Sequence, residues 1–422
     1  MLKIDVNNNI KKYQPIIFIG LYLSLIIGFF LGENSTGGAI IDHNSHKWIS
    51  QKFAENFLNT LFSYDSYNTR HSPILIIFLS FFEKLNINDQ IIRLIHLHFC
   101  LLLPYVFFKC LQLNFKSLDK NILLFFVSLI FLSPTFRSLS IWPDSRIIGL
   151  TFFLISIFYF LKFKENKKFE YVIKNIFYLS LSSYISPNFS VFSIFYFINY
   201  MNNYNIFSQK FLIIILLNIL LSIPAIYYIF FLDINFLIKS AAIGRTSGNI
   251  IFDNIFNDIL ITFSIIFFYI FPFLITKIIK PAKIFEIKSF FISSIIFIIC
   301  VLNFDYNFEY SGGGIFLKFS NIFFESNFVF FIISFLSIII LIPLLYQNKS
   351  NILLLVLIIL NNPQYTIYHK YFDPFLLIVF FTIFIFKCDF KKTFQKNGNY
   401  IFIYFYFSLF LLISNLKYIW IN

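Results

Sequence analysis

Charged residues are scarce in this chain, and their scarcity excludes most kinds of soluble protein. Asp, Glu, Lys and Arg make up 13% of the 422 residues, against about a quarter in an average soluble domain. A globule of this size could not cover its surface with so few charged groups, and 59% of its residues are hydrophobic. A soluble enzyme, a nucleic-acid-binding protein and a secreted disulfide-linked scaffold are therefore excluded.

Cysteine is scarce as well. The four residues are Cys100, Cys110, Cys300 and Cys388, and all of them lie in or beside apolar runs. They show no metal-ligand spacing, and buried thiols of this kind are usually inert packing residues. The sequence therefore indicates no disulfide framework.

Apolar runs close to the ~20 residues that span a bilayer recur along the whole chain. They predict an all-helical protein with about 11 to 13 membrane spans in one integral membrane domain, residues 1–422. The first span covers 16–31, a long loop with amphipathic helices covers 32–90, and the other spans and short loops fill 91–422. The other apolar runs lie at 91–112, 122–133, 147–162, 211–232, 259–279, 287–303, 328–346, 350–361, 372–387 and 399–419.

Two apolar segments have a second interpretation. The stretch 173–200 is interrupted by Ser186-Pro187-Asn188, so it is predicted to form two short helices that meet in a polar turn. The first run follows Lys11 and Lys12 and also fits a signal peptide, although no clear small-x-small cleavage site follows it.

Lysine marks one side of the membrane. Lys-rich loops lie at 162–174, 277–288 and 387–398, and further Lys residues precede the first span. With 173–200 counted as a hairpin, all of these segments fall on the same side. Because cytoplasmic loops carry an excess of Lys and Arg, we predict that this side is the cytoplasm.

The opposite side has a different chemistry. Its loops at 32–90, 134–146, 186–188, 233–258, 304–327 and 361–372, counted with their rims, hold all five Arg and all six His. Arg is informative here because most of the basic residues in this chain are Lys. A guanidinium offers a fixed fork of donors that suits phosphate or carboxylate. We therefore expect any chemistry on the non-cytoplasmic side.

Three outer loops supply the candidate site residues. Asp42 lies in a Gly-rich segment and is either a solvated loop acid or a general base, which needs a carboxylate within reach of a hydroxyl. Asp42, His43 and His46 could also bind a metal ion, but so few visible ligands lead us to predict no metal and no other cofactor. The candidates for substrate binding are Arg70, His71, Arg137, Asp144, Arg146, His369, Lys370 and Tyr371.

The same outer residues have a simpler interpretation as membrane anchors. Trp142 and the Arg residues that flank it belong to the types that occur at membrane interfaces. The segment at 369–371 could extend its side chains to lipid headgroups. A functional site is favoured because the candidate residues of all three loops lie on the same side of the membrane.

A long first outer loop with an early Asp, Lys-rich inner loops, about a dozen spans and the segment HKYFDP at 369–374 together resemble the GT-C superfamily. Its members are integral membrane glycosyltransferases that use polyprenyl-phosphate sugars. The HKYFDP segment is similar to one that members place before a late span, and Asp42 falls where they have a first-loop catalytic Asp. Many members have an Asp-Glu pair there, whereas His43 follows Asp42 here, so Asp65 and Asp144 stay alternative bases.

The resemblance implies transfer of a sugar from a polyprenyl-phosphate donor to a lipid-linked or cell-envelope acceptor. It implies that Asp42 is the general base and that Arg or Lys side chains stabilise the departing lipid phosphate. The expected location is the cytoplasmic membrane of a bacterium, with membrane lipid around the protein, the active site facing outward and no nucleic acid as a partner.

The inner loops support a lipid-linked donor independently of the resemblance. Nucleotide sugars are cytoplasmic, yet no inner loop is large enough for a nucleotide-binding domain, and the motif G-x-x-x-x-G-K-[ST] is absent. Two other classes stay open, namely a lipid-linked glycan polymerase or ligase and a polytopic transporter. A transporter normally has ionisable residues or broken helices inside its spans.

Overall fold

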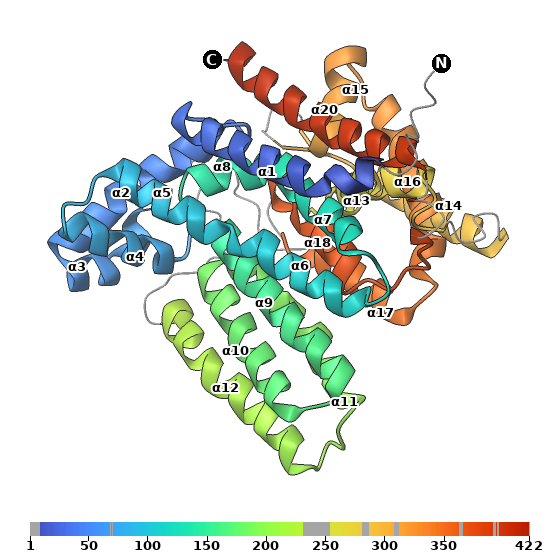
Figure 1. Ribbon diagram of the computed structural model, residues 1–422. Helices are drawn as coiled ribbons and strands as arrows, with labels where there is room; N and C mark the ends of the chain where they lie inside the picture. The colour runs from blue at the N-terminus through green and yellow to red at the C-terminus, as the bar shows by residue number, and fades with distance from the viewer. Residues whose placement is uncertain are drawn as a thin grey trace. The chain divides into compact units, whose positions relative to one another are not determined.

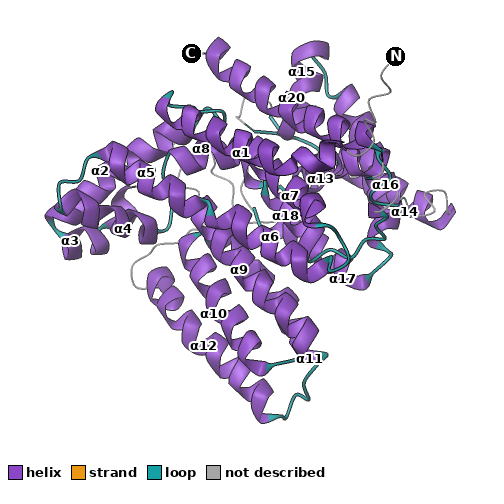
Figure 2. Ribbon diagram, in the orientation of Figure 1, coloured by secondary structure: helices purple, strands orange, loops and turns teal. Residues whose placement is uncertain are grey.

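The computed structural model of the protein describes residues 9–67, 69, 71–230, 254–280, 287–307, 312–362, 366–390, 394 and 396–421. Within these ranges the regular elements are helices, and the one extended pairing is an isolated bridge between Ile279 and Cys388 (Figure 2). The chain packs as two compact units. We call them the N-terminal unit, Tyr13–Ala242 with Phe407–Asn422, and the C-terminal unit, Met1–Lys12 with Ile243–Tyr406.

Seven helical segments of the described chain are long and apolar enough to cross a bilayer. They are Lys11–Phe30 in α1, Asp89–Asn114 in α5 and α6, Ser145–Asn166 in α9, Gln209–Tyr227 in α12, Ile255–Ile275 in α13, Phe328–Leu345 in α16 and Asn397–Leu416 in α20. The pair Lys120–Leu132 and Pro134–Ile141, bent by 66°, would be an eighth span. The protein is thus an α-helical polytopic membrane protein, as its composition predicted.

This count is lower than the predicted 11 to 13 spans, because several apolar runs form short helices. The runs 350–361 and 372–387 become α17 (Lys349–Leu360) and α18 (Phe375–Thr382), of 12 and eight residues. At 1.5 Å per residue, α17 is about 18 Å long, against a hydrocarbon core of about 30 Å. All eight residues of α18 are buried, so this helix is part of the core of the C-terminal unit.

The helix α12 shows why the long helices need lipid. Along it, Leu212, Leu216, Ile219, Leu220 and Ile223 are each more than half exposed. Their spacing of four, three, one and three residues puts them on one side of the helix. Water would make such a contiguous apolar face costly, whereas the acyl chains of a bilayer solvate it.

The N-terminal unit contains α1 from Tyr13 onward, the elements that follow it up to α12, and the end of α20 from Phe407 onward. Its helices are α1 (Asn9–Phe30), α2 (Ala39–Glu55), α3 (Phe57–Phe62), η2 (Tyr64–Tyr67), α4 (Pro73–Lys84), α5 (Asp89–Cys100), α6 (Leu102–Asn114), α7 (Lys120–Ser128), η3 (Leu129–Leu132), α8 (Pro134–Ile141), α9 (Ser145–Asn166), α10 (Phe169–Ile185), η4 (Pro187–Phe192), α11 (Ser193–Met201) and α12 (Gln209–Phe230). In this unit α9 packs against α10 and α6, and α10 also packs against α12 (Figure 1).

Two local predictions for this unit are confirmed. The stretch 173–200 is broken at Ser186-Pro187, where α10 ends and the short helix η4 leads into α11. The first outer loop is helical, and α2 packs against α4. The buried residues of α2 recur at helical spacing, as an amphipathic helix requires; they are Ala39, His43, His46, Ile49, Ser50 and Phe53.

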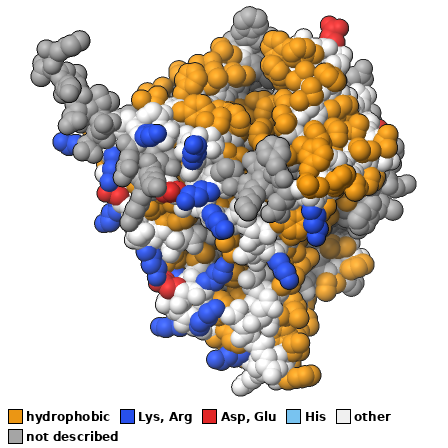
Figure 3. Space-filling model, turned by 90° about the vertical axis from the view of Figure 1, so that its right-hand side faces the viewer, with side chains coloured by type: hydrophobic (Ala, Val, Ile, Leu, Met, Phe, Trp, Pro, Cys, Tyr) orange, Lys and Arg blue, Asp and Glu red, His pale blue; other side chains and the backbone are white. Residues whose placement is uncertain are grey.

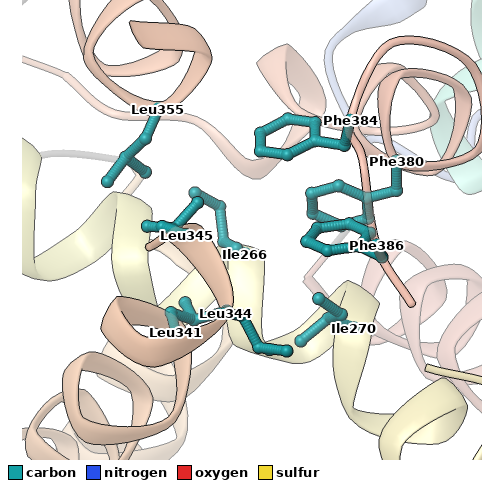
Figure 4. A pocket seen from close by; sticks show the side chains of 9 residues that line it. All are labelled: Ile266, Ile270, Leu341, Leu344, Leu345, Leu355, Phe380, Phe384 and Phe386. Carbon is teal, nitrogen blue, oxygen red and sulfur yellow. The ribbon is translucent and has the colours of Figure 1, made fainter. Parts of the chain in front are cut away.

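The C-terminal unit is organised around α13. Its described helices are α13 (Ile255–Ile275), α14 (Ile287–Leu302), α15 (Gly314–Phe324), α16 (Phe328–Leu345), α17, η5 (His369–Tyr371), α18 and the start of α20 (Asn397–Ile421). The helix α13 packs against α14, α15, α16, α17 and α18. Figure 4 shows an apolar pocket whose lining includes Ile266, Leu344 and Phe380. All nine lining side chains are aliphatic or aromatic hydrocarbons, so this pocket supplies no acid, base or cation.

Contacts between loops agree with the predicted grouping of loops by side. On the Lys-rich side, Lys280 pairs with Asp389 (3.2 Å). On the other side, Asn257 Nδ2 donates to Asp305 Oδ1 (2.5 Å). Each contact joins two loops that the sequence analysis assigned to the same face. Figure 3 shows one face of the protein, where a broad hydrophobic area lies mostly apart from the Lys and Arg side chains.

Which side is the cytoplasm stays a prediction, and labelling can test it. We expect a membrane-impermeant maleimide added from outside to react with a Ser63→Cys variant and not with Asn166→Cys, because the Lys-rich loop is retained inside. Asn166 is exposed at the end of α9. Three native cysteines are buried, and burial raises the pKa of Cys388 to about 12, so background labelling should be slow. Labelling at residue 166 alone would reverse the orientation.

Candidate functional site

Two carboxylates and one imidazole meet in the N-terminal unit, and we call this group the Asp-His-Asp cluster. It consists of Asp42, His71 and Asp144, each of which offers one ligand atom, and these atoms all lie within 4.8 Å of one another. Asp144 is 1% exposed, and the other two residues are half-buried. The three residues come from parts of the chain about 30 and 70 residues apart, so only the fold brings them together.

Each residue of the cluster stands at the start of a helix. Asp42 lies in the first turn of α2, where a negative charge is favoured by the helix dipole. Asp144 is the N-cap of α9, and its Oδ1 accepts from the backbone N–H of Arg146 (2.7 Å). His71 precedes Ser72, the N-cap of α4. The cluster therefore sits at three helix N-termini, which all favour negative charge.

A second imidazole lies against the cluster. The ring of His46 meets the ring of His71 edge to face, with centroids 4.3 Å apart. His46 Nδ1 lies 3.3 Å from the carbonyl oxygen of Pro143. A carbonyl only accepts, so Nδ1 carries the proton and Nε2 keeps its lone pair. His46 is fully buried, and Nε2 has no hydrogen-bond partner among the described residues.

The cluster combines imidazoles of lowered pKa with two carboxylates that repel each other. Burial lowers the pKa of His46, and burial together with the neighbouring His46 lowers the pKa of His71 to about 3. Both imidazoles are therefore neutral at physiological pH. Two carboxylates at the cluster's separation repel each other by on the order of 3 kcal/mol at an effective dielectric constant of about 20. The nearby Arg146, whose charge acts on His71, offsets part of this repulsion.

Arg137, predicted to bind substrate, is instead engaged with its own chain. Its guanidinium donates to both carboxylate oxygens of Glu33 (2.5–3.0 Å) and to the hydroxyl and carbonyl oxygens of Ser24 (2.9 Å each). Gly28 leaves the room for this pair, because a Cβ there would lie only 2.2 Å from Glu33 Oε2. The indole N–H of Trp142 donates to the Glu33 carbonyl (2.9 Å). These contacts join the start of the first outer loop to α8 and the turn after it.

Other candidates of the first outer loop lie apart from the cluster. His43 Nε2 bonds to Asp89 Oδ1 (3.1 Å), and neither His43 nor His46 belongs to the group of ligand atoms within 4.8 Å of one another. Asp65, an alternative base, is exposed on η2. Arg70 lies outside the described residues. Asp42 and Asp144, two of the three carboxylates considered as the base, are thus the pair that the fold brings together.

The late segment belongs to the C-terminal unit. His369, Lys370 and Tyr371 form η5. The hydroxyl of Tyr269, on α13, hydrogen-bonds with His369 Nε2 (3.0 Å). The ammonium of Lys370 lies 5.4 Å from the ring centre of Tyr368, a cation–π distance. Substrate binding by these three residues stays a prediction.

Acidification tests the environment of His369. Burial and the charge of Lys318 lower its pKa from an ordinary value of 6.5 to about 3. Between these two pH values the unfolded chain binds a proton that the folded protein lacks, so stability falls as the pH drops below about 6.5. We expect the unfolding temperature in detergent to fall from pH 7.5 to pH 5, and to fall less in His369→Gln, which keeps an acceptor for Tyr269. An equal drop in both proteins would mean that folded His369 takes up its proton freely.

Comparison with known protein families, with curated proteins and with solved structures finds no match to this chain. The likeness to GT-C glycosyltransferases accordingly rests on the sequence features given above. Sequence reasoning named all three members of the Asp-His-Asp cluster but did not group them. A usable signal was present, since Ser72-Pro73 and Asp144-Ser145 each precede an apolar run and mark a helix start.

Proposed function

We propose that this protein is a membrane glycosyltransferase. It moves a sugar from a polyprenyl-phosphate donor to a lipid-linked or cell-envelope acceptor on the non-cytoplasmic face of a bacterial cytoplasmic membrane. The observation that carries the proposal is the meeting of Asp42 with Asp144 and His71 at the start of membrane helix α9. Carboxylates gathered in a partly buried outer-loop site, beside an Arg, are the groups that base-assisted transfer from a lipid phosphate requires.

In the proposed reaction, Asp42 is the general base. Its carboxylate takes the proton of the acceptor hydroxyl as that oxygen attacks the anomeric carbon of the sugar. The bond between the anomeric carbon and the phosphate oxygen breaks, and the lipid phosphate leaves with the electron pair. Asp42 is half-buried and therefore reachable, whereas Asp144 is almost fully buried and caps α9. This difference favours Asp42 over Asp144 as the base.

The departing phosphate needs a cation, and Arg146 is the first candidate in the N-terminal unit. It lies in the first turn of α9, two residues after Asp144, and is half-buried. The guanidinium of Arg137 already donates to Glu33 and Ser24, so we assign it to holding the loop. A guanidinium can contact two phosphate oxygens at once. The developing charge on a leaving phosphate is the natural target of such a preorganised donor.

A transfer assay with purified protein in detergent tests the proposal. We expect sugar transfer from a polyprenyl-phosphate sugar to a lipid-linked acceptor, and we expect Arg146→Ala to lower kcat/KM for the donor about ten- to a hundredfold. Loss of one charged hydrogen bond costs about 1.5–3 kcal/mol, which corresponds to that range. Lys52→Ala is the matched control, because Lys52 is exposed on the same loop and pairs with Glu55. Equal losses in both variants would mean that outer charge acts only through general attraction.

Transport is the second candidate, and two observations favour it. The apolar segment around Ser133-Pro134 bends by 66°, and Asp258 is buried in the first turn of α13. Broken helices and buried ionisable groups inside spans are common in transporters. The detergent assay separates the two functions, because a transporter without a membrane produces no glycosylated product.

A further inference from the structure

The Asp-His-Asp cluster combines its two carboxylates with two imidazole donors. His71 Nδ1 hydrogen-bonds with the hydroxyl of Ser145 (3.4 Å), which leaves Nε2 as the nitrogen directed elsewhere. His46 Nε2 is buried, carries a lone pair and has no hydrogen-bond partner among the described residues. Two imidazoles and two carboxylates are thus gathered in one partly buried place.

This donor set matches the chemistry of a divalent metal ion. Neutral imidazole and carboxylate are the nitrogen and oxygen ligands that Zn²⁺ accepts in a four-coordinate site. Metal-bound His residues commonly donate their other ring N–H to a carbonyl or another acceptor. His46 makes such a contact with the carbonyl of Pro143, and His71 has the hydroxyl of Ser145 at its Nδ1. A cation would also remove the repulsion between the two carboxylates.

We propose that the N-terminal unit binds one divalent transition-metal ion, best matched by Zn²⁺, through Asp42, His71 and Asp144, with His46 Nε2 as the fourth donor. Ligand atoms around a tetrahedral Zn²⁺, at about 2.0–2.1 Å from the metal, lie about 3.4 Å from one another. The ligand atoms of the three cluster residues already lie within 4.8 Å of one another. His46 lies outside this group, with its ring centroid 4.3 Å from that of His71, so its side chain has to rotate to bring Nε2 to the metal.

The inference goes beyond glycosyl transfer and does not depend on it, because metal binding is measured without donor or acceptor. It also differs from the metal site considered from the sequence, which used His43. In the structure His43 bonds to Asp89, and His71 and Asp144 are the ligands that the fold supplies instead.

Metal content of the full-length protein in detergent tests the proposal. After removal of bound ions with a chelator, we expect the protein to retain one Zn²⁺ per chain on dialysis and to unfold at a higher temperature with Zn²⁺ than without it. Asp144→Asn keeps a side-chain oxygen for the N-cap of α9 but removes the charge, so it should lower Zn²⁺ affinity at least tenfold and lose most of the thermal shift. His46→Gln should act in the same direction, which provides a second variant if either one folds poorly.

Two control variants change the same residue types elsewhere. Asp65→Asn lies on the exposed η2, and His98→Gln is exposed on α5, so both should bind Zn²⁺ as the unaltered protein does. Less than half an equivalent of Zn²⁺ on the unaltered protein would overturn the proposal. Equal affinity in Asp144→Asn, His46→Gln and the two controls would overturn it as well, because the metal would then bind elsewhere.

Discussion

Replacing Asp42 with Asn is expected to lower glycosyl transfer about 10²-fold or more, while the protein still inserts into the membrane and folds. Asn has nearly the size of Asp and keeps an oxygen that can accept a hydrogen bond, but it cannot take the proton of the acceptor hydroxyl. Asp42 lies at the N-terminal end of the amphipathic helix α2 and is half-buried, so the change should leave packing intact. The measurement is kcat with saturating donor, together with the unfolding temperature of the same preparation.

Asp65→Asn is the matched control for this variant. Asp65 belongs to the same outer loop but is exposed on η2, so transfer by Asp65→Asn should stay within about twofold of the original rate. Near-normal turnover in Asp42→Asn would contradict the assignment of the base and shift it to Asp144 or Asp65.

Metal content separates the two roles proposed for Asp42. If Asp42→Asn loses transfer but keeps Zn²⁺ through the other three donors, the carboxylate acts as the base. If transfer and Zn²⁺ are lost together, and excess Zn²⁺ restores transfer, Asp42 acts as a metal ligand and the assignment of the base is wrong. Both measurements use the same purified sample.

Replacing Glu33 with Ala is expected to destabilise the protein by about 3–5 kcal/mol, because it leaves the charge of Arg137 buried without its partner. The two side chains are only 11% and 7% exposed, so the guanidinium has little contact with bulk water once the carboxylate is gone. The same change removes the contact through which the start of the first outer loop is attached to α8. The measurement is the shift in unfolding temperature in detergent, with the yield of folded protein as a second readout.

An exposed ion pair provides the comparison. Lys116 and Glu165 are in contact, but their side chains are 64% and 34% exposed, and exposed pairs contribute about 0–1 kcal/mol. Lys116→Ala should therefore change the unfolding temperature little. If Glu33→Ala were equally mild, the pair with Arg137 would not hold the loop, and Arg137 would return to the candidates for phosphate binding.

The sequence by itself determined that this protein lies in a membrane, and it determined the chemical character of the loops. Low charge and recurrent apolar runs predict a helical membrane protein, because about 20 apolar residues in helical form match the thickness of a bilayer. The break at Ser186-Pro187 and the helices of the first outer loop were also predictable, since turn residues and helical spacing act locally. The Lys-rich loops predicted groupings by side that agree with the contacts between loops.

Only the tertiary structure decided which apolar runs are long enough to span and which polar residues meet. The run that contains α18 reads like a span, but this helix ends at Thr382 and is buried among its neighbours, because hydropathy does not distinguish a lipid-facing helix from a core helix. Arg137 reads like a phosphate ligand, but its partner Glu33 is 104 residues away in the chain. Likewise, Asp42, His71 and Asp144 form one cluster only because the N-termini of α2, α4 and α9 converge. Spacing along the chain carries no information about such contacts, since they arise from helix packing rather than from local sequence.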